Sequence, residues 1–244
     1  MKDTTFTIIE NKRIAKSVYQ MTLSGDTSDI TKPGQFVNIK IDGFYLRRPI
    51  SVCDCEKDRL TLVYKVVGHG TDELSRMEAG KKLLILTGLG NGYDTALSAD
   101  KPLLLGGGVG VPPLYLLAKK LREENKEVTV ILGFNTREEV FFEDEFKAIG
   151  CTVKVATADG TYGEKGFVTD ILPKDYTYFF TCGPLPMLKA VFKNTRTSGQ
   201  LSFEERMGCG FGACMGCSCK TITGYKRICK DGPVLKKEEI LWTD

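Results

Sequence analysis

The chain has 244 residues, a length that suits one or two domains of about 100–200 residues each. Hydrophobic residues make up 42% and charged residues 27%, which excludes an intrinsically disordered chain. The formal net charge is only +3, so a nucleic-acid-binding surface does not dominate the protein. His69 is the only histidine, which excludes any mechanism that needs two.

The sequence gives no sign of secretion or membrane insertion. Residues 1–16 lack an apolar core of signal-peptide length. The longest uncharged stretch, residues 102–118, is interrupted by glycines and prolines and is too short to span a bilayer. We therefore expect a protein of the reducing cytoplasm without membrane contact, in which clustered cysteines more often bind metal than form disulfides.

Residues 1–100 are predicted to form a small antiparallel β-barrel. Turn signals at residues 32–34 and 42–43 separate short runs of alternating apolar residues. Several short strands at such close spacing are typical of a barrel. A short helix is expected over residues 71–78, ending before Gly80. The expected strands cover residues 5–10, 35–41, 49–55 and 59–67.

From residue 101 strands alternate with helices, which implies a parallel sheet with crossover helices over residues 101–200. We expect strands over residues 103–105, 128–133, 151–156 and 176–181, and helices over residues 112–124, 138–149 and 184–194. Residues 201–244 form a third segment. Much of it is rich in glycine and cysteine, so something other than a hydrophobic core must organise it.

Two loops in the first hundred residues offer groups that bind phosphate. Arg48 stands beside Pro49, where a guanidinium can hold a pyrophosphate through two hydrogen bonds, and Ser51 could bond a ring nitrogen. Gly70 and Thr71 follow at a helix start, where backbone N–H groups and the helix dipole favour phosphate. Basic loop residues are more often simply solvated, so these signals alone are weak.

Two further turns are predicted at the carboxyl ends of parallel strands, where open α/β sheets bind ligands. The first turn contains four glycines: Gly106, Gly107, Gly108 and Gly110. Val111 stands where the G-x-G-x-x-G pattern needs its last glycine, so a tight turn of any α/β protein is the alternative. The second turn holds Cys182, Gly183 and Pro184.

Five of the nine cysteines fall between residues 209 and 229. Their spacing, C-x4-C-x2-C and a fourth cysteine after eleven residues, is that of plant-type [2Fe–2S] sites. A structural zinc site is the alternative, although zinc sites usually show two C-x2-C pairs. Cys219 competes as the fourth ligand, but it leaves little chain to close around a cluster. The predicted ligands are Cys209, Cys214, Cys217 and Cys229.

Together the motifs at residues 48–51 (Arg-Pro-Ile-Ser), 63–65 (Val-Tyr-Lys), 106–110 and 182–184 resemble those of ferredoxin–NADP reductase-like flavoenzymes. This resemblance implies an FAD-binding barrel and a nicotinamide-binding α/β domain. It implies FAD contacts at Arg48, Pro49, Ile50, Ser51, Val63, Tyr64, Lys65, Gly70 and Thr71. Many members carry an aromatic residue where this chain has Ile50. The two turns would bind NAD, with Cys182 either at the nicotinamide ring or an ordinary buried thiol.

The cysteine-rich tail narrows the resemblance to the electron-transfer subunits of NAD-dependent, two-subunit dihydroorotate dehydrogenases. That resemblance implies a partner subunit that carries FMN and oxidises dihydroorotate, in an assembly of two copies of each chain. Electrons would pass from it through the [2Fe–2S] cluster and FAD to NAD+, in the biosynthesis of the pyrimidine nucleotide UMP. This chain has no evident dihydroorotate site and is not expected to oxidise dihydroorotate alone.

A flavin suits the middle of such a chain, because it exchanges two electrons with nicotinamide and single electrons with a cluster. Two alternatives remain: a subunit of an NAD(P)H:ferredoxin or sulfide-type oxidoreductase, and a zinc-stapled nucleotide-binding protein without redox activity. The choice between NAD and NADP also stays open. Arg137 favours a 2′-phosphate, whereas Glu138 and Glu139 oppose it.

Overall fold

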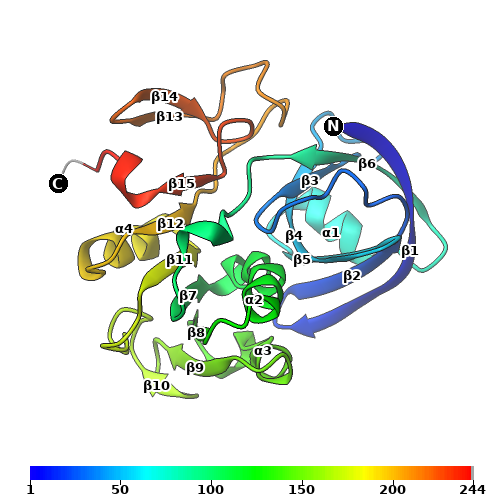
Figure 1. The fold of residues 1–244 in the computed structure, drawn as a ribbon. Helices are drawn as coiled ribbons and strands as arrows, with labels where there is room; N and C mark the ends of the chain where they lie inside the picture. Colours follow the sequence, from blue (N-terminus) through cyan, green and yellow to red (C-terminus); the bar gives the residue numbers. More distant parts are fainter. Residues whose placement is uncertain (243–244) are drawn as a thin grey trace.

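The computed structural model describes residues 1–242, which form three parts (Figure 1). A closed N-terminal barrel, drawn in blue and cyan, lies beside a largely parallel sheet drawn in green and yellow. A cysteine-rich hairpin segment, drawn in orange and red, completes the chain. Within the described residues, no helix combines the length and the apolar character needed to cross a bilayer.

The barrel closes through antiparallel strands in the order β1-β2-β5-β4-β3-β6, as expected. Alternate side chains point inward, and residues such as Phe6, Met21 and Leu62 fill the interior. Strands β2 and β6 were not predicted. Strand β6 is a nearly continuous apolar run in the sequence, and the alternation of buried and less buried side chains along it is seen only in the structure. The strands are β1 (Lys2–Ala15), β2 (Val18–Ser24), β3 (Phe36–Ile39), β4 (Arg48–Glu56), β5 (Arg59–Lys65) and β6 (Lys82–Leu89).

A short helix, α1 (His69–Ser75), packs against the barrel core. Leu74 and Met77 contribute to that core. The amide of Asn11 on β1 donates to the carbonyls of Leu74 and Met77, at 2.9 and 3.0 Å. The helix begins two residues earlier than predicted and ends three residues earlier, because the N–H groups of Arg76 and Met77 bond three residues back, to Glu73 and Leu74.

The second part is a 7-stranded sheet in the order β10-β9-β8-β7-β11-β12-β15, in which only β15 runs antiparallel to its neighbour. This confirms the expected parallel sheet. Its strands are β7 (Pro102–Gly107), β8 (Thr129–Phe134), β9 (Thr152–Thr157), β10 (Glu164–Lys165), β11 (Tyr178–Cys182), β12 (Gly199–Ser202) and β15 (Val234–Lys236). Three α-helices connect them: α2 (Pro113–Glu123), α3 (Glu143–Ala148) and α4 (Leu185–Asn194). Single 3₁₀ turns cover Thr95–Leu97, Gly108–Gly110, Arg137–Glu139 and Lys237–Glu239.

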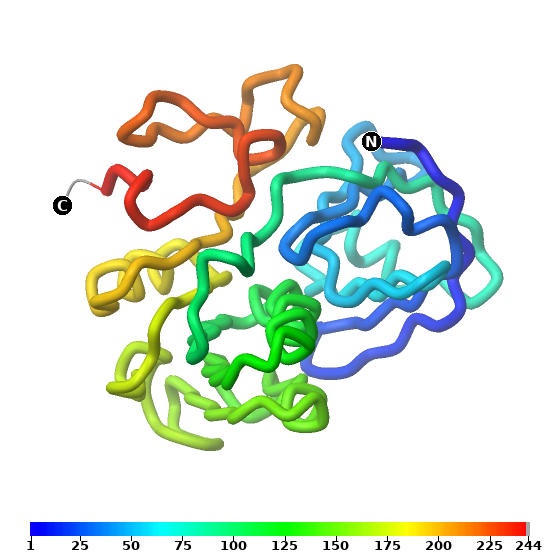
Figure 2. Tube along the Cα trace, viewed as in Figure 1, coloured from blue at the N-terminus to red at the C-terminus, as the bar shows by residue number. Residues whose placement is uncertain are grey.

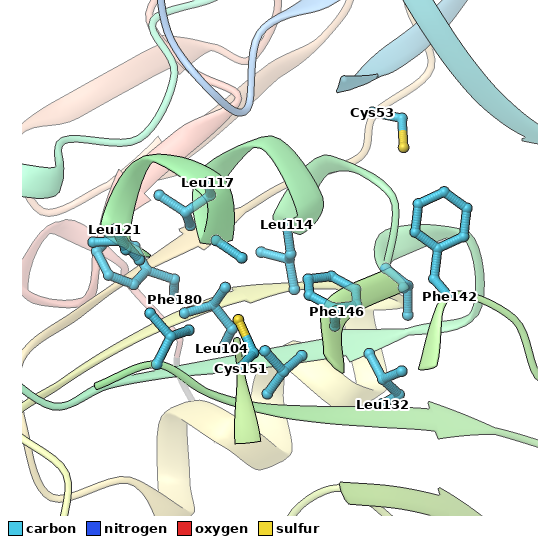
Figure 3. Packing of buried hydrophobic residues seen from close by; sticks show 14 of the residues in the cluster. Cys53, Leu104, Leu114, Leu117, Leu121, Leu132, Phe142, Phe146, Cys151 and Phe180 are labelled. Carbon is cyan, nitrogen blue, oxygen red and sulfur yellow. The ribbon is translucent and has the colours of Figure 1, made fainter. Parts of the chain in front are cut away.

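Helix α2 packs on one face of this sheet (Figure 3). Leu114, Leu117 and Leu121 recur at helical spacing and are fully buried. They share a core with Leu104 of β7 and Phe180 of β11. These residues form one buried stripe along the helix, which the sequence predicted over residues 112–124.

The predicted helix over residues 138–149 is wrong in its first half. Residues Arg137–Glu139 form a 3₁₀ turn, and Phe142 has a left-handed φ of 69°. Phe141 and Phe142 are both buried, and their rings meet edge to face at 5.7 Å. The left-handed backbone of Phe142 cannot continue a right-handed helix, so α3 starts only after it.

The linker that follows β6 joins all three parts (Figure 2). Tyr93 is buried and donates its hydroxyl to the carbonyl of Thr181 at 2.9 Å, while its N–H bonds to Pro33 of the barrel. Asn91 donates to the carbonyl of Val234 at 2.7 Å and accepts from the same residue's N–H at 3.1 Å. The linker thereby fixes the barrel, the sheet and the C-terminal segment relative to one another.

The C-terminal segment does not stand apart from the sheet. It contributes β15, which pairs with β12 at the edge of the sheet. Just after β15, Lys237 donates to the carbonyls of Thr195 and Thr197, at 2.6 and 3.4 Å. Its ammonium also lies 5.6 Å from the centre of the Phe179 ring. These contacts anchor the segment beyond the C-terminus of α4.

Candidate functional site

The four predicted ligand cysteines lie on a loop and a hairpin. Cys209, Cys214 and Cys217 precede β13 (Ser218–Thr221), which pairs with β14 (Gly224–Arg227) through a tight turn. The hairpin returns the chain so that the N–H of Ile228 bonds to the carbonyl of Cys217 at 3.1 Å. The hairpin therefore brings Cys229 beside Cys217, although eleven residues lie between them.

The sulfurs form two neighbouring pairs. The Cys209 sulfur accepts from the N–H groups of Ala213 and Cys214, at 3.2 and 3.4 Å, and the Cys214 sulfur accepts from the N–H of Cys209 at 3.5 Å. The Cys217 sulfur accepts from the N–H of Cys229 at 3.4 Å. Backbone donors aimed at sulfur stabilise thiolates and the anionic centres that thiolates hold.

These surroundings shift the cysteine pKa values in opposite directions. Partial burial opposes ionisation of Cys209, but the backbone donors outweigh it and lower the Cys209 pKa to about 6. Burial, a hydrogen bond to Cys217 and the charge of that neighbour raise the Cys229 pKa to about 12. Like-charge coupling of this kind arises when thiolates share a small site, and a bound cation removes it.

Two pairs of thiolates suit a two-iron centre, which places two protein ligands on each metal atom. Within residues 1–242, no three His, Cys, Asp or Glu side chains converge in a way that would hold one metal ion. Cys219 belongs to β13, opposite Lys226, and packs partly buried against the core beside the sheet. Cys229 instead follows the hairpin, where its N–H donates to the Cys217 sulfur and its side chain lies next to the cysteine loop.

Arg227 fastens the loop to the hairpin. Its guanidinium donates to the carbonyl of Gly212 at 2.9 Å and pairs with the Asp231 carboxylate at 3.0 Å. The Asp231 carboxylate also accepts from the Arg227 N–H at 2.9 Å. The sequence does not point to Arg227, because its partners lie up to 15 residues away and no local pattern marks them.

The structure brings together two of the predicted flavin-binding stretches. The guanidinium of Arg48, on β4, lies directly against Gly70 of α1 and donates to the carbonyl of Leu46. It also lies 4.8 Å from the centre of the Phe44 ring. A side chain at Gly68 would meet nothing within 4 Å, so the backbone here is open to a ligand. An open backbone beside a positioned guanidinium fits a pyrophosphate.

Thr71 shapes this turn rather than facing the open space. Its hydroxyl oxygen accepts from the N–H groups of Val67 and Gly68, at 3.0 and 3.2 Å, and the hydroxyl donates to the Gly68 carbonyl. These two backbone donors are therefore already bonded. Any phosphate at this helix start would use the remaining N–H groups of the first turn.

The other predicted flavin residues divide between the barrel interior and its surroundings. Tyr64 is buried in the barrel core and donates its hydroxyl to Asn11 at 3.0 Å, and Ile50 packs against the same core. Val63 is buried in the core shared with the sheet domain. Lys65 pairs with Glu139 of the sheet domain at 3.2 Å. Pro49 and Ser51 lie half-buried on β4, paired with β3.

Replacing Gly70 with alanine should weaken FAD binding without unfolding the chain. A Cβ at this position would come within 2.6 Å of Arg48 Nη2, and a long side chain gives way more easily than backbone. We expect an increase of about 10-fold in the FAD dissociation constant, the equivalent of one charge-assisted hydrogen bond. Fluorescence titration of the FAD-free chain measures it. Ser75→Ala, on the same helix but not against Arg48, should leave the constant unchanged; an equal change in both variants contradicts this role for Arg48.

The two predicted turns of the sheet domain lie side by side. Strands β7 and β11 are neighbours, with Gly106 paired to Cys182, so both turns leave the same edge of the sheet. A Cβ at Gly107 would come within 2.5 Å of the Met187 sulfur, and one at Gly110 would collide with the Cys182 carbonyl. Gly107 therefore allows a side chain to approach the turn, and Gly110 allows the two turns to pack backbone against backbone. Gly108, with φ of 53°, is the one that faces open space.

Cys182 lies at this edge as a partly buried residue whose side chain packs inward. Burial raises the Cys182 pKa to about 12, only partly offset by a hydrogen bond with Ser202. The side chain packs against the core that contains Tyr93. This arrangement favours the interpretation of Cys182 as a buried strand-end thiol, while leaving its backbone at the crevice between the two turns.

The acidic residues that follow β8 are already paired with the barrel. Glu138 forms an ion pair with Lys16 at 2.8 Å, and Glu139 pairs with Lys65 while accepting from the Asn135 N–H at 3.2 Å. Arg137 lies 5.6 Å from the centre of the Tyr162 ring. Glu138 and Glu139, which the sequence offered as residues that oppose a 2′-phosphate, thus also tie the two domains together, whereas Arg137 contacts its own domain.

A closed barrel, a parallel sheet with two turns at one edge, and a four-cysteine segment packed against both define a flavoprotein reductase with an attached iron–sulfur segment. Two family models agree. The iron–sulfur cluster binding domain of dihydroorotate dehydrogenase B matches residues 204–241, and the oxidoreductase NAD-binding domain matches residues 104–193.

Relatives that align over nearly the whole chain identify a more specific family within this class. The dihydroorotate dehydrogenase B (NAD(+)) electron transfer subunit of Bacillus pumilus is 43% identical, with 98% of each chain covered. The subunit of the same name from Fusobacterium nucleatum is also 43% identical, over 98% of this chain and 99% of that one. The chain belongs to the family of electron transfer subunits of dihydroorotate dehydrogenase B.

Solved structures support the same fold. An NADH-dependent reduced ferredoxin-NADP oxidoreductase, described as a flavin-based electron-bifurcating enzyme, aligns with a TM-score of 0.87 and 31% identity, covering 97% of this chain and 90% of that one. A ferredoxin NADP+ reductase from Neisseria gonorrhoeae aligns with a TM-score of 0.69 at 19% identity, covering 80% and 90%. The second likeness concerns the fold alone.

Proposed function

We propose that this chain carries FAD and a [2Fe–2S] cluster and passes electrons from dihydroorotate oxidation to NAD+. When bound, the cluster supplies single-electron transfer and the flavin supplies exchange between single electrons and hydride. The chain's residues hold and orient these groups. Cys209, Cys214, Cys217 and Cys229 hold the cluster, and Arg48 with the start of α1 holds the FAD pyrophosphate.

The observation that carries this proposal is the packing of the three predicted cofactor regions against one another. Phe36 of the barrel shares a buried core with Cys217 and Cys229 of the cysteine segment. Lys65 of the barrel is paired with Glu139 of the sheet domain. Cofactors bound at these places would lie in one compact body, as electron transfer between them requires.

The remaining predicted contacts complete the proposal. Pro49, Ile50, Ser51, Val63, Tyr64, Lys65, Gly70 and Thr71 form or support the FAD site. The turn Gly106–Gly110 and the turn with Cys182, Gly183 and Pro184 frame the NAD site. The open backbone at Gly108 suits a coenzyme phosphate, and the buried thiol of Cys182 leaves only its backbone to border the coenzyme.

The partner that we propose is a catalytic subunit that contains FMN and oxidises dihydroorotate to orotate, in a complex of two copies of each chain. The relatives of this chain are named electron transfer subunits, and such a subunit implies a catalytic partner. The complex would serve the synthesis of UMP, and the cytoplasm is the compartment in which its reduced cysteines persist.

Expression with and without the catalytic subunit tests the division of labour. We expect the chain alone, purified without air, to contain iron, sulfide and flavin and to reduce a dye with NADH. It should form no orotate from dihydroorotate until the partner is added, when orotate and NADH should appear in equal amounts. Dihydroorotate oxidation by the chain alone, or a colourless and iron-free chain, would falsify the proposal.

The alternative of a ferredoxin-linked oxidoreductase receives support from the 31% identity to the reduced ferredoxin-NADP oxidoreductase. An assay with reduced ferredoxin as electron donor separates the two functions. NADH formation from reduced ferredoxin, with none from dihydroorotate in the complex, favours the alternative. The match to an iron–sulfur family model favours iron over the zinc-stapled alternative.

A further inference from the structure

Asn38 occupies the contact between the barrel and the cysteine segment. It lies on β3 and is 1% exposed. Its neighbours Val37 and Ile39 face the barrel core, so Asn38 faces outward together with Phe36. The Phe36 ring packs in the core that contains Cys217 and Cys229. The cysteine segment therefore covers the outer face of β3 at this point.

One side of the Asn38 amide contacts the loop that carries the first ligand cysteine. Its Nδ2 donates to the carbonyl of Cys209 at 3.4 Å. The next residue, Gly210, has a φ of 78°, and a Cβ there would collide with Asn38 Nδ2. The loop thus approaches the amide as closely as a residue without a side chain permits.

The other side of the amide lacks a partner. Asn38 Oδ1 is buried and accepts no hydrogen bond from any described residue. Asn38 is paired directly with Pro49 of β4, which has no N–H, and paired residues share one face of a sheet. Pro49 belongs to the proposed flavin site. A buried amide oxygen normally finds a donor, so the donor is expected from outside the chain.

We propose that Asn38 is a positioning residue that links the cluster loop to the bound flavin through a single amide. Nδ2 holds the carbonyl of Cys209, and Oδ1 accepts a hydrogen bond from a donor of the flavin, either its ring imide or a ribityl hydroxyl. This inference rests on the proposed FAD and cluster sites. Because β3 is buried along its whole length and is paired with β4 and β6, the amide would hold the two redox groups at a set distance.

Two substitutions test the two proposed hydrogen bonds of Asn38 separately. Asn38→Leu has a similar shape and removes both donor and acceptor. Asn38→Asp keeps an acceptor oxygen and removes the donor to Cys209. Asn194→Leu is the matched control, because Asn194 is an exposed asparagine that also donates to a backbone carbonyl, that of Ala190 at 2.8 Å. The full-length chain is used throughout, with iron and flavin content measured first.

We expect Asn38→Leu to raise the FAD dissociation constant about 10-fold, the equivalent of one buried hydrogen bond, and to change the EPR spectrum of the reduced cluster. Asn38→Asp should change the spectrum while keeping the FAD constant within about 3-fold of the unaltered chain. Asn194→Leu should change neither.

Three results overturn the link: unchanged FAD binding in Asn38→Leu, an unchanged cluster spectrum in both variants, or equal losses of FAD affinity in both. If Asn38→Leu does not accumulate as folded protein, the cluster spectrum and the FAD dissociation constant of Asn38→Asp, each compared with those of the unaltered chain, decide whether the link exists. Iron and flavin in the unaltered chain test the proposed function separately, so its failure is distinguishable from failure of the link.

Discussion

Replacing Cys229 with serine should abolish the absorbance and EPR signal of the cluster and reduce dihydroorotate-linked NADH formation by about 100-fold or more. Cys229 is 2% exposed and lies against the Cys217 sulfur, so no other side chain can take its place without moving the hairpin. A serine hydroxyl is a poor ligand for iron, because it stays protonated where a thiol ionises. Reduction of a dye by NADH should persist, since it needs only the flavin.

Cys219→Ser is the matched control for this prediction. Cys219 is the cysteine nearest in sequence to the loop that is not assigned as a ligand, and it lies on a regular strand opposite Lys226. We expect its variant to keep full iron content and an unchanged EPR spectrum. The reverse pattern, with the cluster lost in Cys219→Ser and kept in Cys229→Ser, would show that Cys219 is the fourth ligand.

Replacing Gly110 with alanine should destabilise the protein by about 3 kcal/mol, toward the upper end of the cost of overpacking. The new Cβ would collide with the Cys182 carbonyl and come within 2.6 Å of Gly183 Cα. Both are backbone atoms, so they cannot rotate away as a side chain would. The two turns would be forced apart, and the KM for NADH should rise by about 10-fold as the crevice between them widens.

Urea unfolding and steady-state dye reduction measure these two effects. Gly108→Ala is the control within the same turn, because a Cβ at Gly108 would meet nothing within 4 Å. Its cost should be limited to about 1–2 kcal/mol of left-handed backbone strain at φ of 53°. Equal destabilisation in the two variants would mean that strain, rather than contact between the turns, governs Gly110.

Short-range chemistry explains why much of this protein could be predicted. The cysteine spacing, the turn glycines and the alternation of strands with helices all act within about 20 residues of sequence. The parallel sheet and the helix over residues 112–124 appear in the structure as expected. The helix predicted over residues 138–149 failed because Phe141 and Phe142 respond to a distant core rather than to local propensity.

The residues of the candidate site also divide into those that the sequence could indicate and those that only the fold brings into view. Residue type and spacing were enough to select the four cysteines and Arg48, because ligand chemistry is a property of the side chain itself. Spacing did not reveal Asn38, Arg227 or the pairing of Glu139 with Lys65, because each depends on a partner that folding brings near. Asn38 meets Cys209 across 171 residues, and Glu139 meets Lys65 across 74.

The sequence by itself therefore determined the kinds of cofactor, the order of the three regions and the family resemblance. Only the tertiary structure decided how those regions contact one another: which amide reaches the cluster loop, which lysines engage the acidic pair after β8, and which glycines serve packing rather than phosphate. The physical reason is that covalent neighbours define local chemistry, whereas contacts between distant segments depend on how buried surfaces fit when the whole chain folds.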